Sequence, residues 1–228
     1  MKPVIKIEVV SDVVCPWCYI GKRRLEKAIN LSNQDFDFEV EYQPFELNPS
    51  MPKEGRNQKE YLISKFGSEA QYQNITANTT NVAAEEGLSF NFSKQLVSPN
   101  TRDAHRIIWF AKEHGKQQEV KEAFMKAYFE DGVDLSKNEN LLAVATSAGL
   151  DAKQVTDLLN SELGLADVIE AEQLNIQRGV SGVPFYIING KYGISGAQSP
   201  TTFAQAFTEI GKELVLESNS CDVDAKAC

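Results

Sequence analysis

The sequence predicts an α/β fold in which a β-α-β unit at the start and a β-β-α unit at the end are separated by a long helical segment. Residues 4–10 form a β-branched run, which is typical of a buried strand. Residues 57–178 show helical spacing of apolar side chains and little strand pattern. Residues 185–188 and 191–195 flank Asn189-Gly190, the dipeptide that a type I′ hairpin turn favours. These patterns divide the chain into an outer α/β part and a helical insertion.

The opening unit places a cysteine at the start of a helix. The strand at residues 4–10 gives way to a polar break and then to Cys15-Pro16. Proline suits the first turn of a helix, where its missing N–H costs nothing. Apolar residues of the segment 21–29 recur at helical spacing, and residues 36–42 alternate apolar and polar side chains as a second strand does. The order is therefore strand, helix, strand, with Cys15 at the helix N-terminus.

The helical insertion is predicted as all-helical over residues 51–178, after a Pro-rich loop at residues 48–55. Several of its helices end at a glycine, the residue that a left-handed C-terminal cap favours. These glycines are Gly67, Gly87, Gly115, Gly149 and Gly179.

The closing unit ends in an amphipathic helix that opens at Ser199-Pro200. Its apolar face consists of Phe203, Phe207, Ile210 and Leu214. We predict one discontinuous domain from residues 1–50 and 179–215, with residues 216–228 as a flexible tail. Without the insertion, the order of elements is the minimal thioredoxin fold.

Composition narrows the classes of function. The chain has 228 residues, 42% hydrophobic and 24% charged, which is ordinary for a globular protein. Its formal net charge of −9 argues against nucleic acid and anionic membranes as partners. No apolar run approaches the roughly 20 residues of a membrane helix, and the first residues lack a signal-peptide pattern, so we expect a cytoplasmic protein.

The motif Cys15-Pro16-Trp17-Cys18 carries the predicted chemistry. In a reducing cytosol, a close cysteine pair is more often catalytic or metal-binding than structural. A helix N-terminus stabilises an anion, so we expect Cys15 to be the attacking thiolate. Cys18 lies one turn further on and is placed to resolve a mixed disulfide. The sequence predicts a thiol–disulfide oxidoreductase or isomerase that acts on disulfides of proteins or small thiols.

Three segments together resemble the DsbA-like superfamily. They are Asp12-Val-Val-Cys-Pro-Trp-Cys-Tyr-Ile-Gly21, residues 179–184 with the motif Gly-Val-Ser-Gly-Val-Pro, and residues 195–198. Within the superfamily the chain is similar to FrnE-type proteins, relatives of 2-hydroxychromene-2-carboxylate isomerases and kappa-class glutathione transferases. Residues 99–106 resemble a stretch of that group's helical domain. The resemblance implies a thioredoxin fold with a helical insertion and dithiol–disulfide activity.

The resemblance also implies a substrate-binding surface. It implies that Pro184 is cis and faces the cysteine pair, with Val183 offering its backbone to an extended polypeptide across the site. Pro16 and Trp17 complete this predicted surface. No bound cofactor or metal is expected, and glutathione is a candidate redox partner.

Other readings of the same residues stay open. Cys15 and Cys18 could supply half of a zinc site, with Cys221 and Cys228 as the other half. Glutathione-dependent isomerase or transferase chemistry ranks second, because serine usually replaces the first cysteine in those relatives. A redox-inert binding or holdase module is the third reading.

Further residues carry weaker expectations. His105 is more often a satisfied helix residue, and the resemblance raises its chance of facing the active-site cleft. The Lys22-Arg23-Arg24 cluster is expected on a solvated helix face. Cys221 and Cys228 are predicted as an auxiliary redox pair on the tail, because two of the four cysteines lie within eight residues.

Overall fold

A four-stranded sheet joins the two ends of the chain. The structure is a computed structural model that describes residues 2–224, with side chains described through Leu214. The strand order is β2-β1-β5-β6. Its strands are β1 (Val4–Ser11), β2 (Asp37–Pro44), β5 (Phe185–Ile188) and β6 (Tyr192–Ser195). Parallel β1 and β2 pair along their whole length, and β5 lies antiparallel on the other side of β1. The predicted opening and closing units therefore meet at the centre of one sheet.

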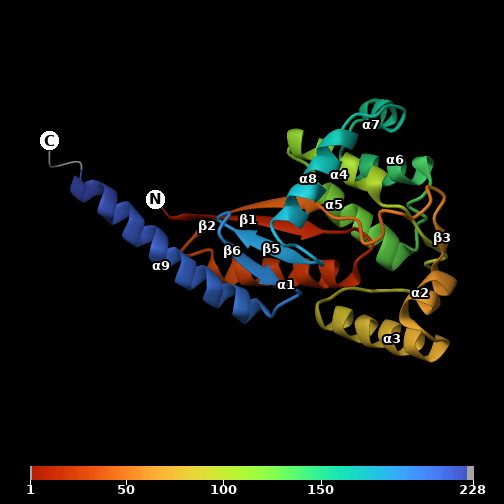
Figure 1. Cartoon of the computed structure of the whole chain (residues 1–228), viewed down its shortest axis with the longest axis horizontal. Coiled ribbons are helices and arrows are strands. Elements are labelled where there is room, and N and C mark those ends of the chain that lie inside the picture. The colour runs from red at the N-terminus through yellow and green to blue at the C-terminus, as the bar shows by residue number, and fades with distance from the viewer. Residues whose placement is uncertain (1, 225–228) are drawn as a thin grey trace.

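Helices cover both faces of this sheet (Figure 1). Helix α1 (Pro16–Ser32) packs beside α9 (Pro200–Asp224) on one face. Helices α4 (Arg102–Glu113), α5 (Gln117–Lys126) and α8 (Leu165–Gln177) contact β2 on the other. Figure 1 shows α9 continuing well past the edge of the sheet. The thioredoxin arrangement predicted from the order of elements is confirmed.

The insertion is mostly helical. Its remaining helical elements are α2 (Gln58–Phe66), α3 (Glu69–Glu85), the π-helical turn η1 (Ala127–Asp131), α6 (Asn138–Ser147) and α7 (Ala152–Leu159). The prediction of an all-helical insertion was wrong in one respect, because β3 (Arg56–Asn57) pairs antiparallel with β4 (Val97–Ser98). Two-residue strands are too short for an alternating pattern to show in the sequence. The pair fastens the start of α2 to the loop before α4.

One hydrophobic core serves the sheet and the insertion together. Ile7 of β1 and Leu25 of α1 belong to the same buried cluster as Phe124 of α5 and Leu158 of α7. All five glycines predicted to end helices have positive φ, as left-handed caps require. Among the described residues, none of the helices combines the length and the apolar character that a bilayer crossing needs.

The basic cluster of α1 is not a solvated face, contrary to expectation. Lys22 is only 5% exposed, and its Nζ lies 2.7 Å from Oε2 of Glu122 on α5. Arg23 pairs with the same carboxylate, and Arg24 Nε lies 2.6 Å from Oε1 of Glu86. The acidic partners stand 62 to 100 residues away in sequence. The cluster therefore joins α1 to the insertion.

Glu122 makes this joint pH-dependent. Burial alone would raise the pKa of its carboxyl, but the charges and hydrogen bonds of Arg23, Lys22 and Tyr19 lower it to about 2. A depressed folded-state pKa gives stability that is present above the unfolded value, near 4.5, and lost as pH falls toward 2. In acid denaturation, Glu122→Gln is expected to flatten the fall in unfolding free energy between pH 5 and 2, relative to the parent chain. Glu139→Gln, at an exposed position of α6, is the control that should keep the parent slope. Parallel slopes for all three proteins would contradict the assignment.

Candidate active site

The cysteine pair opens helix α1. Cys15 is the N-cap residue, Pro16 occupies the first turn, and the Cys18 N–H donates to the Cys15 carbonyl at 3.0 Å. Both cysteines are free thiols, 4% and 2% exposed. The first turn of α1 contains no acidic residue, and Cys15 lies at the positive end of the helix dipole.

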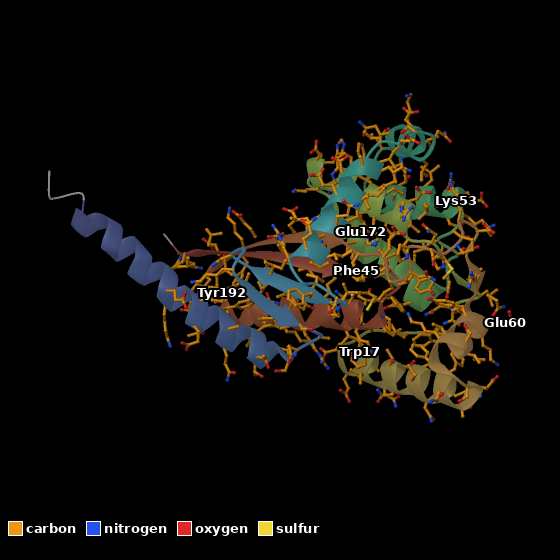
Figure 2. The ribbon with its side chains drawn as sticks, viewed as in Figure 1. Trp17, Phe45, Lys53, Glu60, Glu172 and Tyr192 are labelled. Carbon is orange, nitrogen blue, oxygen red and sulfur yellow. The ribbon has the colours of Figure 1, made fainter. Side chains whose placement is uncertain are left out.

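The second half of the chain brings Val183 and Pro184 to the same place. The Val183–Pro184 peptide bond is cis, as the resemblance implies. The Cys15 thiol donates to the Val183 carbonyl, with 3.6 Å between sulfur and oxygen. Trp17 is 37% exposed, and Figure 2 shows it between the start of α1 and helix α3. The residues predicted for the site thus lie together, although 168 residues separate Cys15 from Val183.

Gly21 lets α1 approach this proline. A Cβ at Gly21 would overlap the buried Tyr186 hydroxyl and lie 3.2 Å from Pro184 Cγ. Overpacking of this kind costs about 1–3 kcal/mol, so Gly21→Ala is expected to lower the free energy of unfolding by that amount in urea titrations. Gly182→Ala is the matched control, because a Cβ there would meet nothing within 4 Å. Equal stability of the two variants would show that Tyr186 and Pro184 move aside without cost.

A buried carboxylate lies behind the cysteines. Asp12 is 1% exposed, and its Oδ2 accepts from the Leu47 N–H at 2.8 Å. Its Oδ1 lies 3.3 Å from His105 Nε2. Burial alone would raise the pKa of Asp12, but the His105 hydrogen bond and charge and the Leu47 N–H together lower it. Asp12 is therefore an ionised group in the interior.

Lys121 of α5 is the second buried charge. It is 1% exposed, and its Nζ donates to the Ser11 carbonyl at 3.4 Å. Burial lowers the pKa of Lys121 to about 8, although the negative charges of the cysteines and Asp12 oppose the shift. Burial, and then the neighbouring Cys15 sulfur, raise the pKa of Cys18 well above its ordinary value. The positive charge of Lys121 lowers the pKa of Cys18, so the charge of the lysine and the protonation of the inner thiol influence each other.

Sequence reasoning missed Asp12 and Lys121 as functional candidates. Asp12 was read only as the polar end of a strand. Lys121 lies at the spacing of the buried residues of α5, between Val120 and Phe124. A lysine within an apolar helix stripe was the signal that could have identified it.

His105 is a buried, hydrogen-bonded residue of α4, which agrees with the first of its two sequence interpretations. It is 2% exposed on α4 and is directed to Asp12, behind the cysteine pair. It does not line the cavity that contains Cys15. The expectation that it faces the cleft was wrong, because α4 packs on the opposite face of the sheet from α1 and presents His105 to the core.

The structure describes only part of the predicted tail. Helix α9 continues through Asp224, so residues 216–224 of the predicted flexible tail are helical. The side chain of Cys221, and Cys228 entirely, lie outside the described residues. Their predicted role as a redox pair stays a prediction.

A cavity of about 290 Å³ opens over Cys15. The opening of α1 and Val183 form one wall, and the insertion forms the others. Most of the side chains contributed by the insertion are apolar or aromatic. They include Met51, Tyr61, Leu62, Phe66, Ile75, Phe92, Tyr128 and Phe129. The reactive sulfur expected from the sequence therefore meets an apolar, partly enclosed space.

Comparison with known proteins agrees with this geometry. A Bacillus subtilis protein named as the uncharacterized protein YwbO is 27% identical over 212 residues, covering 92% of this chain and 98% of its own. A Streptomyces coelicolor structure named as a probable DsbA oxidoreductase is 36% identical, with a TM-score of 0.85 over 90% of this chain and 89% of its own. The cytosolic disulfide reductase DsbM of Pseudomonas aeruginosa, solved with GSH, shares the fold at 14% identity and a TM-score of 0.62, over 91% and 99%. The model of the DSBA-like thioredoxin domain matches residues 6–208, and the chain belongs to that family.

Proposed function

We propose that this protein is a thiol–disulfide oxidoreductase that works through Cys15 and Cys18. The observation that carries the proposal is the placement of Cys15. It is the N-cap residue of α1, its sulfur contacts the Val183 carbonyl, and it lines an apolar cavity. Cys18 follows in the first turn and is buried. An exposed outer thiol is not needed, because the cavity gives a substrate access to the sulfur.

The first exchange step uses the outer cysteine. The Cys15 thiolate attacks one sulfur of a substrate disulfide, a new S–S bond forms, and the substrate's other sulfur leaves as a thiolate that takes a proton. The product is a mixed disulfide between Cys15 and the substrate.

The second step uses the inner cysteine. Cys18 gives up its proton and attacks the Cys15 sulfur, which forms the intramolecular disulfide and releases the second substrate thiol. Because the pKa of Cys18 is raised, this step needs a proton acceptor. Neutral Lys121, with a pKa of about 8, is the acceptor we assign. The reverse sequence, starting from the oxidised pair, transfers a disulfide to a dithiol substrate.

The relatives support this class of reaction. The Streptomyces coelicolor protein is named for DsbA oxidoreductase activity and the Pseudomonas aeruginosa protein as a cytosolic disulfide reductase. By analogy we place the reaction in the cytoplasm, with glutathione as a redox partner. The presence of both cysteines favours dithiol exchange over glutathione-dependent isomerase or transferase chemistry, which needs one thiol or hydroxyl at this position.

A redox titration tests the proposal. The protein is equilibrated in buffers of graded glutathione and glutathione disulfide, quenched with acid and alkylated. Mass spectrometry of the peptide that contains both Cys15 and Cys18 gives the oxidised fraction. We expect one two-electron transition and a Cys15–Cys18 disulfide. If this peptide stays fully alkylated at oxidising ratios, the proposed function is wrong.

A further inference from the structure

The cavity over Cys15 is built for a compact ligand. Its volume of about 290 Å³ is near the lower end of small-molecule sites, which begin at about 300 Å³. Helices α2 and α3 cover it and bring Leu62, Phe66 and Ile75 to its walls. These side chains, with Met51 and Phe129, present apolar surface to whatever is joined to Cys15. An extended polypeptide can bring only one side chain into such a space.

One buried donor in the cavity has no partner. Gln95 is 4% exposed and lines the cavity, and its Nε2 has no hydrogen-bond partner in the structure. Its Oε1 accepts from Gln58 Nε2 at 3.4 Å, and Gln58 Oε1 accepts from the Tyr72 hydroxyl at 3.3 Å. In these contacts both amide oxygens accept a hydrogen bond and Gln58 Nε2 donates one. The unused N–H groups of Gln95 call for an acceptor on a ligand, since an unpaired buried donor costs about 1–3 kcal/mol.

The charges of the lining disfavour an anionic ligand. Two charged side chains are among the residues that line the cavity, Asp12 and Lys65. Asp12 is buried, and its lowered pKa keeps it ionised close to Cys15. Lys65 is exposed, with its Nζ 5.8 Å from the centre of the Tyr61 ring. A carboxylate next to the reacting sulfur would therefore meet a negative charge and lose its water.

We propose that the substrate is a low-molecular-weight thiol or disulfide with a neutral aromatic or branched aliphatic group next to its sulfur, and with an acceptor oxygen or nitrogen facing Gln95. This inference rests on the proposed function and names its substrate class. The apolar group fills the space beneath α2 and α3 when the substrate sulfur is bonded to Cys15. Extended proteins and glutathione, whose charged ends remain outside, gain little from the cavity.

The test measures how strongly Cys15 holds different thiols. The Cys18→Ser variant is loaded as the Cys15–glutathione mixed disulfide and equilibrated with benzyl mercaptan or 2-mercaptoethanol. In this exchange the incoming thiol gives up its proton and attacks the Cys15 sulfur as a thiolate, the bond to glutathione breaks, and glutathione leaves as a thiolate that takes up a proton. Mass spectrometry of the Cys15 peptide gives each equilibrium constant. The same exchange measured with the unfolded chain in urea gives the equilibrium constants without the cavity. Each constant of the folded protein is divided by the corresponding constant of the unfolded chain.

After that correction, we expect benzyl mercaptan to be favoured over 2-mercaptoethanol by at least about tenfold, because a phenyl group buries roughly 100 Å² of apolar surface. Thr76→Phe places a ring into the cavity from α3 and should reduce the preference to below about threefold. Asn78→Phe is the matched control on the same helix, at an exposed position that does not line the cavity, and should keep it.

The outcomes separate the two proposals. Equal constants for the two thiols, or a preference that Thr76→Phe leaves unchanged, overturn the substrate class while the oxidoreductase proposal stands. Failure of Cys15 to form a mixed disulfide with any of the three thiols, while the folded state is intact, overturns both. The substrate class is also overturned, in favour of a protein substrate, if scrambled ribonuclease exchanges with Cys15 faster than benzyl mercaptan does and Thr76→Phe leaves the ribonuclease rate unchanged.

Discussion

Cys18→Ser is expected to trap a stable mixed disulfide at Cys15, and Cys15→Ser is expected to reduce exchange to the uncatalysed level. The asymmetry follows from position. Cys15 caps α1 and lines the cavity, whereas Cys18 is 2% exposed and its pKa is raised by burial and by the Cys15 sulfur. Without Cys18, nothing on α1 attacks the Cys15–substrate bond. Without Cys15, the remaining thiol is mostly protonated and out of reach.

Trapping is measured by incubating each variant with glutathione disulfide and separating the species by non-reducing mass spectrometry. Peptide mapping distinguishes Cys15 from Cys221 and Cys228. The parent chain is the control, and it should pass through the mixed disulfide without accumulating it. Accumulation of the adduct in Cys15→Ser instead would reverse the roles assigned to the two cysteines.

Lys121→Met is expected to slow the second step by about 100-fold at pH 8, at the low end of what a general base contributes. A parent adduct of glutathione at Cys15 is formed and held in acid, where Cys18 stays protonated, and is then shifted to each test pH. The parent rate of glutathione release should rise with pH and level off above about pH 8, as Lys121 loses its proton. The variant should lack that inflection. Lys126→Met, on the same helix but at an exposed position, is the control that should keep the parent profile.

The free energy of unfolding distinguishes a proton-acceptor role of Lys121 from a purely structural role. The pKa of Lys121 is lowered from 10.5 to about 8 in the folded protein, so the unfolded chain binds more protons between those values. The parent's free energy of unfolding should therefore rise between pH 8 and 10.5, and this rise should be absent in Lys121→Met. Replacing a buried charge with an apolar side chain of similar length is often neutral or stabilising. Slower exchange with a loss of several kcal/mol of stability would instead mean that Lys121 supports the fold alone.

Local signals in the sequence were sufficient for the elements that carry the site. A β-branched run, a proline after Cys15 and the Asn189-Gly190 turn act over a few residues, and each element they predict is present. The positions of the cysteine pair and Pro184 followed from motifs. The short β3–β4 pairing was not predicted, because its two strands lie 40 residues apart and are too short for an alternating apolar–polar pattern.

Interactions between distant helices could not be predicted in the same way. Lys22, Arg23 and Arg24 resemble a solvated face until Glu122 and Glu86 are placed against them. The direction of His105 depends on which face of the sheet α4 covers, and one helix's periodicity does not determine this. Asp12 and Lys121 can be recognised as site residues only in the folded structure, where they lie near enough to Cys18 and to each other for their charges to interact.

The central position of β1 has a consequence for how the chain is made on the ribosome. One edge of β1 can pair with β2 as soon as residue 44 has emerged, but its other edge waits for β5, which begins at residue 185. At about 5–20 residues per second, the 140 residues between them take roughly 7–28 s to synthesise. During that time the nascent chain presents an unpaired apolar strand edge, the kind of surface that recruits chaperones or pairs with a neighbouring chain.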